Sequence, residues 1–233
     1  MRLLAFETSA KAGSVALLED DRLLAESYQN TGLTHSQTVL SMAEDMLKSC
    51  GLTPGDIDAV AVAAGPGSFT GVRIGVAAAK GFAWGAEKPC CGVSTLEAMA
   101  LNLGVPTGYV LSVMDARREQ VYTALFRAEE GQLSRITEDR AISLAELAQE
   151  LAQLQGPIFL VGDGSLVCHR ALKGTVSALV LPAEHRMHQR AAGVALAAAR
   201  QLREGAPCDG ATLIPNYLRL SQAERERLAR EQK

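Results

Sequence analysis

"AVAVAAGPGSFTGVRIG" occupies Ala59–Gly75 and joins a short apolar run to a glycine turn and then to a helical pattern. An apolar run of this length, bounded by turn residues, is typical of a buried parallel strand. From residue 69 to about residue 83 the spacing is helical, and Gly71, Gly75 and Ala79 lie on one narrow face. The stretch therefore predicts a strand, a turn and a helix of an α/β fold.

The glycine turn has two interpretations. Its G-x-G-x-x-x-G spacing differs by one residue from the dinucleotide fingerprint, and it lacks the Gly-Lys-Ser/Thr ending of a P-loop. The structural interpretation is that Gly65 and Gly67 permit a sharp strand-to-helix turn, whereas Gly71 and Gly75 let the helix pack closely on a neighbour. The start of a helix also exposes N–H groups, so a phosphate site remains the alternative.

The residues before and after this stretch complete a βββαβα order. Strands are expected at residues 3–8, 14–19 and 22–28. A helix follows, with Thr34 and Gln37 spaced as a capping box and Gly51 as its stop. A strand at residues 89–93 and a helix from about Ser94 lead into the boundary "NLGVPTG".

The second half repeats the order. Its expected strands and helices lie at residues 108–115, 120–127, 135–141, 143–154, 157–163, 166–172 and 178–182, before an Ala-rich helix that ends at Arg203. We therefore expect an N-terminal domain at residues 1–104, a C-terminal domain at 105–210, and a C-terminal segment with a charged tail at 211–233. The tail, "AERERLAREQK", is expected to be a solvated helix.

Two details repeat in register between the halves. One buried strand runs into Gly65–Ser68, and its counterpart runs into Gly162–Ser165. The first strand of each half ends in an acid, Glu7 in one and Asp115 in the other. Because ligands of α/β sheets bind at the carboxyl ends of strands, the two acids are expected to face a cleft. They either hold a hydrated Mg²⁺ there or cap turns.

Composition restricts the classes of function. The net charge is −3 and the 23 Lys and Arg are spread along the chain, so unaided binding to a phosphate backbone is not favoured. The start of the chain lacks an apolar region followed by a cleavage site, and no apolar run approaches the ~18 residues that span a bilayer. We expect a cytoplasmic protein without a membrane contact.

Cysteine and histidine offer little chemistry. The five cysteines are odd in number and show no CxxC spacing, so we expect idle thiols, with a redox or metal role as the alternative. Of the four histidines only His185 and His188 are close, without a third ligand nearby. A G-x-S-x-G elbow is absent. We therefore expect neither catalytic residues nor a metal site.

Five segments resemble one family. They are "LAFETS" at residues 4–9, "THSQTVL" at 34–40, "GPGSFTGVRIG" at 65–75, "MDARREQVY" at 114–122 and "PNYLR" at 215–219, and they resemble the TsaB (YeaZ) family. The resemblance implies an actin-like ATPase (ASKHA) fold with two ribonuclease-H-like halves. It also implies a part in N6-threonylcarbamoylation of adenosine 37 in tRNAs that read ANN codons, with TsaD, the ATPase TsaE and threonylcarbamoyl-AMP from TsaC.

One departure bears on catalysis. TsaD-like relatives carry H-x-x-x-H after the helix that follows the GPG loop, and the matching positions here are Thr95 and Met99. Neither side chain replaces an imidazole ligand. The resemblance therefore implies a non-catalytic scaffold or activator and argues against a metallo-glycoprotease. An independent ATPase or small-molecule kinase of the same fold is the alternative.

The resemblance also suggests where ligands and partners bind. The chain has no expected intrinsic cofactor, and any binding of ATP or ADP with Mg²⁺ is expected to be weak, at Glu7, Thr8, Ser9, Asp115, Gly162 and Gly164. The helices at residues 34–50 and 69–83 are expected to contact TsaD, or a second copy of the chain, through Val39, Met42, Met46, Gly71, Gly75 and Ala79. The alternative is that these six face the chain's own core. TsaE is expected to join the same complex, and this chain is expected to contact tRNA only indirectly, through the complex.

Overall fold

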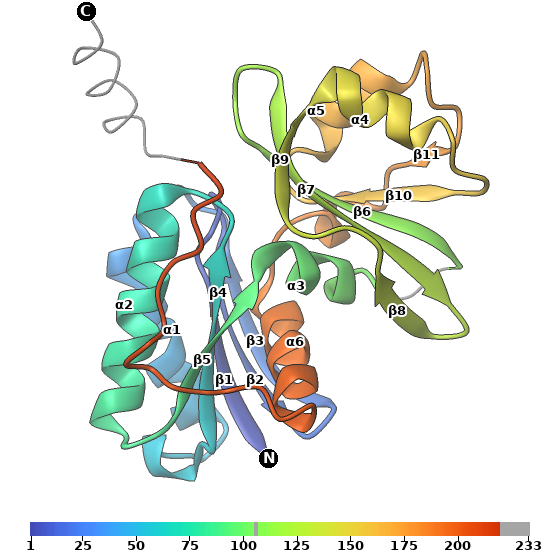
Figure 1. The fold of residues 1–233 in the computed structure, drawn as a ribbon. Coiled ribbons are helices and arrows are strands. Elements are labelled where there is room, and N and C mark those ends of the chain that lie inside the picture. The colour runs from blue at the N-terminus through green and yellow to red at the C-terminus, as the bar shows by residue number, and fades with distance from the viewer. Residues whose placement is uncertain (105–106, 220–233) are drawn as a thin grey trace, which may run out of the picture.

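The computed structural model describes residues 1–104 and 107–219, which form two sheets covered by helices (Figure 1). The charged tail at residues 223–233 lies outside the described residues. Within the described ranges, no helix has the length and apolar content needed to cross a membrane.

The first sheet has five strands in the order β3-β2-β1-β4-β5. Their bounds are β1 Arg2–Glu7, β2 Gly13–Glu19, β3 Arg22–Gln29, β4 Ala59–Gly65 and β5 Cys90–Ser94. Strand β1 pairs antiparallel with β2 and parallel with β4, and every residue of β4 is buried. Helices α1 (His35–Ser49) and α2 (Phe69–Gly85) pack on one face of this sheet. A short 3-10 helix, Pro54–Asp56, precedes β4.

The second sheet has the order β11-β10-β6-β7-β8, with β9 paired to β7. The bounds are β6 Gly108–Asp115, β7 Gln120–Glu129, β8 Gln132–Arg135, β9 Arg140–Ser143, β10 Ile158–Val161 and β11 Leu179–Val180. Helices α4 (Leu144–Leu151) and α5 (Ser165–Leu172) cover one face. A 3-10 helix, Glu184–Arg186, follows β11. The expected α/β architecture of two similar halves is therefore confirmed.

The last helix of each half packs against the other half's sheet. Helix α3 (Thr95–Asn102) contributes to the core beside β6 and β7, whereas α6 (Ala191–Arg203) covers β1, β2 and β4. The two helices cross closely, because a side chain at Gly193 would collide with the carbonyl oxygen of Ala98. The first half is thus βββαβαβα along the sequence, the second half has one more strand before its first helix, and an exchange of helices joins the halves.

Two sequence predictions need correction. The Thr34 side chain makes no cap hydrogen bond, and its carbonyl oxygen instead accepts from the Gln37 N–H at 2.9 Å. The single strand expected at residues 135–141 is two strands, β8 and β9. Between β8 and β9, the Thr137 hydroxyl accepts from the Leu125 N–H of β7 at 2.9 Å. A side chain thus interrupts the backbone pairing with β7 at this point.

Candidate functional site

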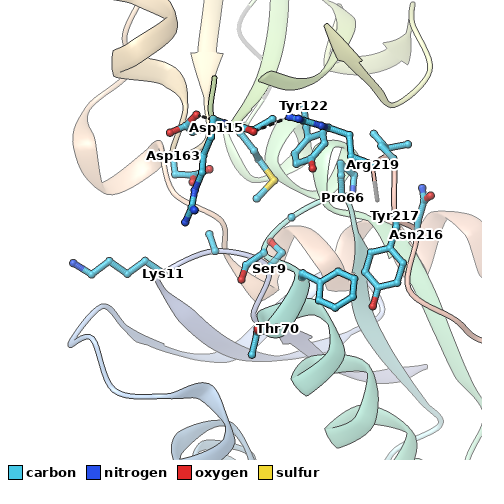
Figure 2. A pocket seen from close by; sticks show the side chains of 18 of the residues that line it. Ser9, Lys11, Pro66, Thr70, Asp115, Tyr122, Asp163, Asn216, Tyr217 and Arg219 are labelled. Atoms are coloured by element: carbon cyan, nitrogen blue, oxygen red, sulfur yellow. Dashed lines mark hydrogen bonds between the residues drawn. The ribbon is translucent and has the colours of Figure 1, made fainter. Parts of the chain in front are cut away.

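A cleft of about 870 Å³ lies between the two halves at the carboxyl ends of their central strands (Figure 2). Its walls come from the loops after β1, β4 and β6, from Asp163 after β10, and from the C-terminal segment at residues 216–219. In Figure 2, Ser9, Lys11 and Thr70 lie across the opening from Asp115 and Asp163. The cleft is where the strand order predicts a ligand site.

The turn between β4 and α2 forms one wall. Gly65 has φ +119°, a conformation that favours glycine, and the Ser68 hydroxyl caps α2 by accepting from the Gly71 N–H at 3.3 Å. The Ser68 N–H donates to the Ser9 carbonyl at 2.6 Å, which ties this turn to the loop after β1. The helix therefore begins at the cleft, with Ser68, Phe69 and Thr70 on its lining.

Thr8 holds helix α2 against β1. Its hydroxyl donates to the Gly71 carbonyl at 2.8 Å in a fully buried contact. A side chain at Gly71 would collide with the Thr8 carbonyl oxygen, and one at Gly75 would collide with the Thr8 hydroxyl. The two glycines are required by this close approach, so their role is structural.

Glu7 is fully buried beneath the cleft and does not line it. Its Oε1 accepts from the Ser9 N–H at 2.6 Å, while Oε2 has no partner among the described residues. Burial raises the pKa of Glu7 to about 7, with a smaller contribution from the charge of Asp163. A carboxyl that is only about half ionised near neutrality and closed off from the cleft is a poor ligand for Mg²⁺.

The second half supplies two carboxylates that reach the cleft. Asp115 is exposed, and its Oδ1 accepts from the Arg117 N–H at 2.7 Å, which caps its own loop. Asp163 is accessible from the cleft and accepts from Gln189 Nε2 at 2.8 Å. Enough protein surrounds Asp163 that desolvation raises its pKa.

The six residues expected to bind nucleotide thus divide into two groups. Ser9 and Asp115 line the cleft, and the Ser9 hydroxyl is buried without a hydrogen-bond partner among the described residues. The other four, Glu7, Thr8, Gly162 and Gly164, lie behind the lining. Gly162 and Gly164 press against the end of β6, where side chains would collide with Val113 and approach the Asp115 nitrogen to 2.9 Å.

Sequence reasoning missed the basic side chains of the cleft. Lys11, Arg117, Arg118 and Arg219 all line it. Residues 117–119 have φ values of +60°, +56° and +57°, a left-handed conformation that costs roughly 1–2 kcal/mol for each residue other than glycine. The segment "MDARREQVY" contained the signal, because it places two arginines two and three residues after a strand-end acid.

The C-terminal segment closes another wall. Asn216 donates its N–H to the Ala64 carbonyl at 2.6 Å, and Arg219 Nη1 donates to the Ala116 carbonyl at 2.8 Å. The Tyr217 ring stacks on Phe69 with centroids 4.6 Å apart, and its hydroxyl accepts from Arg73 Nε at 2.7 Å. The segment therefore bridges the two halves.

The expected interface residues lie in the core. Val39, Met42, Met46 and Ala79 belong to the cluster under α1 and α2, and Gly71 and Gly75 face Thr8. They form no accessible contact surface in this structure, so that part of the prediction is corrected. The outer faces of the helices instead carry Leu40, Ala77, Gly81, Trp84 and Gly85, of which Trp84 is 86% exposed.

The two positions expected to match histidines of the catalytic relatives are also closed. Thr95 and Met99, on α3, are both buried. The Met99 sulfur lies 3.0 Å from where a side chain at Gly162 would begin. Over residues 1–104 and 107–219, no three His, Cys, Asp or Glu side chains gather in a way that could hold a metal ion.

Known proteins resemble most of the chain. The family model described as "TsaD: tRNA N6-adenosine threonylcarbamoyltransferase" matches residues 29–227. The tRNA threonylcarbamoyladenosine biosynthesis protein TsaB of Bacillus subtilis is 34% identical over 96% of both chains. TsaB of Escherichia coli is 41% identical over 70% of this chain and 72% of its own length.

Solved structures agree on the fold. YeaZ from Pseudomonas aeruginosa superposes with a TM-score of 0.75 at 26% identity, covering 93% of this chain and 99% of that one. An activator of 2-hydroxyisocaproyl-CoA dehydratase from Clostridium difficile, solved with bound ADPNP, has a TM-score of 0.50 at 12% identity, covering 88% of this chain and 97% of its own. The fold is therefore the actin-like ATPase fold with two ribonuclease-H-like halves.

Proposed function

The chain belongs to the TsaB family, and from that membership we propose that it is a non-catalytic subunit that binds and activates TsaD, with TsaE as a further partner. The complex modifies adenosine 37 of tRNAs that read ANN codons with an N6-threonylcarbamoyl group, in the cytoplasm. The observation that carries the proposal is the 34% identity to TsaB of Bacillus subtilis over 96% of the chain.

The chemistry of the described residues supports a non-catalytic role. Thr95 and Met99 stand where the catalytic relatives have imidazoles, and both are buried away from the cleft. Glu7, the strand-end acid of the first half, is closed off as well. The remaining cleft acids, Asp115 and Asp163, have no histidine beside them on the cleft lining. This set of residues favours binding over group transfer.

The outer face of helices α1 and α2 is the surface proposed for TsaD, and for a second copy of the chain when TsaD is absent. Ala77, Gly81 and Gly85 are exposed on α2, and nothing lies within 4 Å of where side chains at the two glycines would begin. Small residues let a partner helix approach closely, while Trp84 and the 50% exposed Leu40 supply apolar contact.

Reconstitution tests the proposal. Purified TsaD, TsaE and threonylcarbamoyl-AMP are mixed with tRNA, with and without this protein, and the modified nucleoside is measured. The proposal predicts that modification requires the protein, and that the protein alone modifies no tRNA. Equal modification without it would refute the activator role, and modification by the protein alone would refute the non-catalytic role.

An independent ATPase or small-molecule kinase is the second candidate, favoured by the 870 Å³ cleft with four basic side chains and the start of helix α2 on its lining. Calorimetry of the isolated protein with ATP and Mg²⁺ separates the two. We expect weak binding and no turnover, because Glu7 is buried and the C-terminal segment occupies one wall. Tight binding with hydrolysis would favour the enzyme.

A further inference from the structure

The segment that follows helix α6 wraps around an edge of the first sheet. Cys208 packs with the cluster between this sheet and α6. Gly210 then lies beside Cys90 of β5, because a side chain at Gly210 would begin 3.3 Å from the Cys90 Cβ. Leu213 packs with the cluster on the opposite face, under α1 and α2. On that face, Lys80 of α2 holds the segment by donating from Nζ to the Leu213 carbonyl at 3.1 Å.

This path brings two thiols together. Cys91 of β5 belongs to the cluster on the α6 face, and Cys208 packs against that same cluster, so the two thiols approach each other there. The neighbouring Cys90 points to the opposite face, Cys50 lies at the end of α1, and Cys168 is in the second half. All five are free thiols. Cys91 and Cys208 are therefore the two cysteines that share the α6 face, whereas the side chains of the other three belong elsewhere.

We propose that Cys91 and Cys208 form a reversible disulfide in response to hydroperoxides, and that this bond clamps the C-terminal segment onto edge strand β5. The proposal is independent of the proposed function. Both thiols are free in this structure, and the proposed bond forms only on oxidation.

Exposure assigns the two thiols different roles. Cys208 is half-buried and within reach of a peroxide, whereas Cys91 is buried. The interaction between the two thiols lowers the pKa of Cys208 and, together with burial, raises the pKa of Cys91. The Cys208 thiolate attacks a peroxide oxygen, the O–O bond breaks, and hydroxide leaves to become water. Cys91 then attacks the sulfenic sulfur and the S–O bond breaks. With hydrogen peroxide the sum is two thiols and one peroxide to one disulfide and two waters.

The clamp would act on the cleft. Residues 216–219, which form one of its walls, follow Cys208 by less than a dozen positions. Fixing the start of this segment to β5 reduces the freedom of the chain that Tyr217 and Arg219 hold in place. Oxidation is therefore expected to slow opening of this wall.

The test uses the full-length protein treated with one equivalent of hydrogen peroxide and analysed by non-reducing mass spectrometry. We expect a loss of two hydrogens and one cross-linked peptide pair, reversed by dithiothreitol. Cys91→Ser and Cys208→Ser should abolish the link, whereas Cys90→Ser, the neighbouring control, should retain it. A link through Cys90, or overoxidation of Cys208 without any link, would overturn the assignment.

Hydrogen exchange tests the clamp itself. Amides at residues 211–219 should exchange several-fold more slowly in the oxidised protein than in the reduced one, and Cys208→Ser treated with peroxide should behave like the reduced protein. Equal exchange in a protein shown to carry the cross-link would overturn the proposed effect on the segment.

Discussion

The first strand of each half ends in a carboxylate, but the two ends have different environments. Glu7, at the end of β1, is sealed from solvent and accepts one backbone N–H. Asp115, at the end of β6, is exposed in the cleft and caps a left-handed loop that carries Arg117 and Arg118. The repeat has kept the position of the acid but not its surroundings, so chemistry inferred from one half does not transfer to the other.

The starts of helices α2 and α5 also have different environments. Comparing them gives the prediction with the largest expected change in stability. Gly71, the third residue of α2, touches the Thr8 carbonyl, whereas Val167, the third residue of α5, is 43% exposed. Gly71→Ala should reduce the free energy of unfolding by about 3–5 kcal/mol, because backbone must move to admit the methyl group. Val167→Ala should change it by no more than about 0.5 kcal/mol. Urea unfolding of both variants measures the contrast, and similar losses would show that the two starts are equivalent.

The environment of Glu7 predicts a pH dependence of stability. Its pKa is about 7 in the folded chain against an ordinary value of 4.5, so the folded state binds the proton more tightly. The stabilisation is complete below pH 4.5 and is lost as pH rises through about 7, a decrease in unfolding free energy of roughly 3 kcal/mol.

Glu7→Gln should remove that decrease, since glutamine does not ionise. The unfolding free energy of the variant, measured relative to the wild type, should therefore be higher at pH 8 than at pH 5. Denaturant unfolding at both pH values measures it. Asp115→Asn is the matched control from the other half. We expect this variant to lose at most about 1 kcal/mol of unfolding free energy, through its turn hydrogen bond. Parallel stability profiles for wild type and Glu7→Gln would contradict the buried environment.

Several of these features could be predicted from sequence, and others could not. The apolar run of β4 and the Gly65–Ser68 turn locate a strand and a helix start because few other structures suit such residues. The Ala-rich pattern of α6 predicts a helix, but it does not say which sheet the helix covers. Likewise, Gly71 and Gly81 are both small residues on one helix, and only packing against β1 determines that the first is buried and the second exposed.

A smaller effect concerns the C-terminal segment, which binds the first half through Tyr217. Tyr217→Ala removes the stacking on Phe69 and the bond from Arg73, and should speed hydrogen exchange at residues 211–219 by about 5–30-fold, or roughly 1–2 kcal/mol of local opening. Tyr217→Phe keeps the stacking and should show a smaller increase. Unchanged exchange in the alanine variant would mean that other contacts hold the segment.

We propose that the outer face of the first half binds TsaD, and Gly81→Glu tests this proposal most directly. Gly81 is exposed and helical, so glutamate should raise the stability of the isolated chain by up to about 1 kcal/mol while placing bulk and charge on the proposed surface. Leu166→Glu, at a 48% exposed position on α5, is the control from the other half. In a titration with TsaD, the account predicts lost binding for Gly81→Glu with an unreduced Tm, and wild-type binding for Leu166→Glu. Wild-type affinity of the Gly81→Glu variant for TsaD would contradict it.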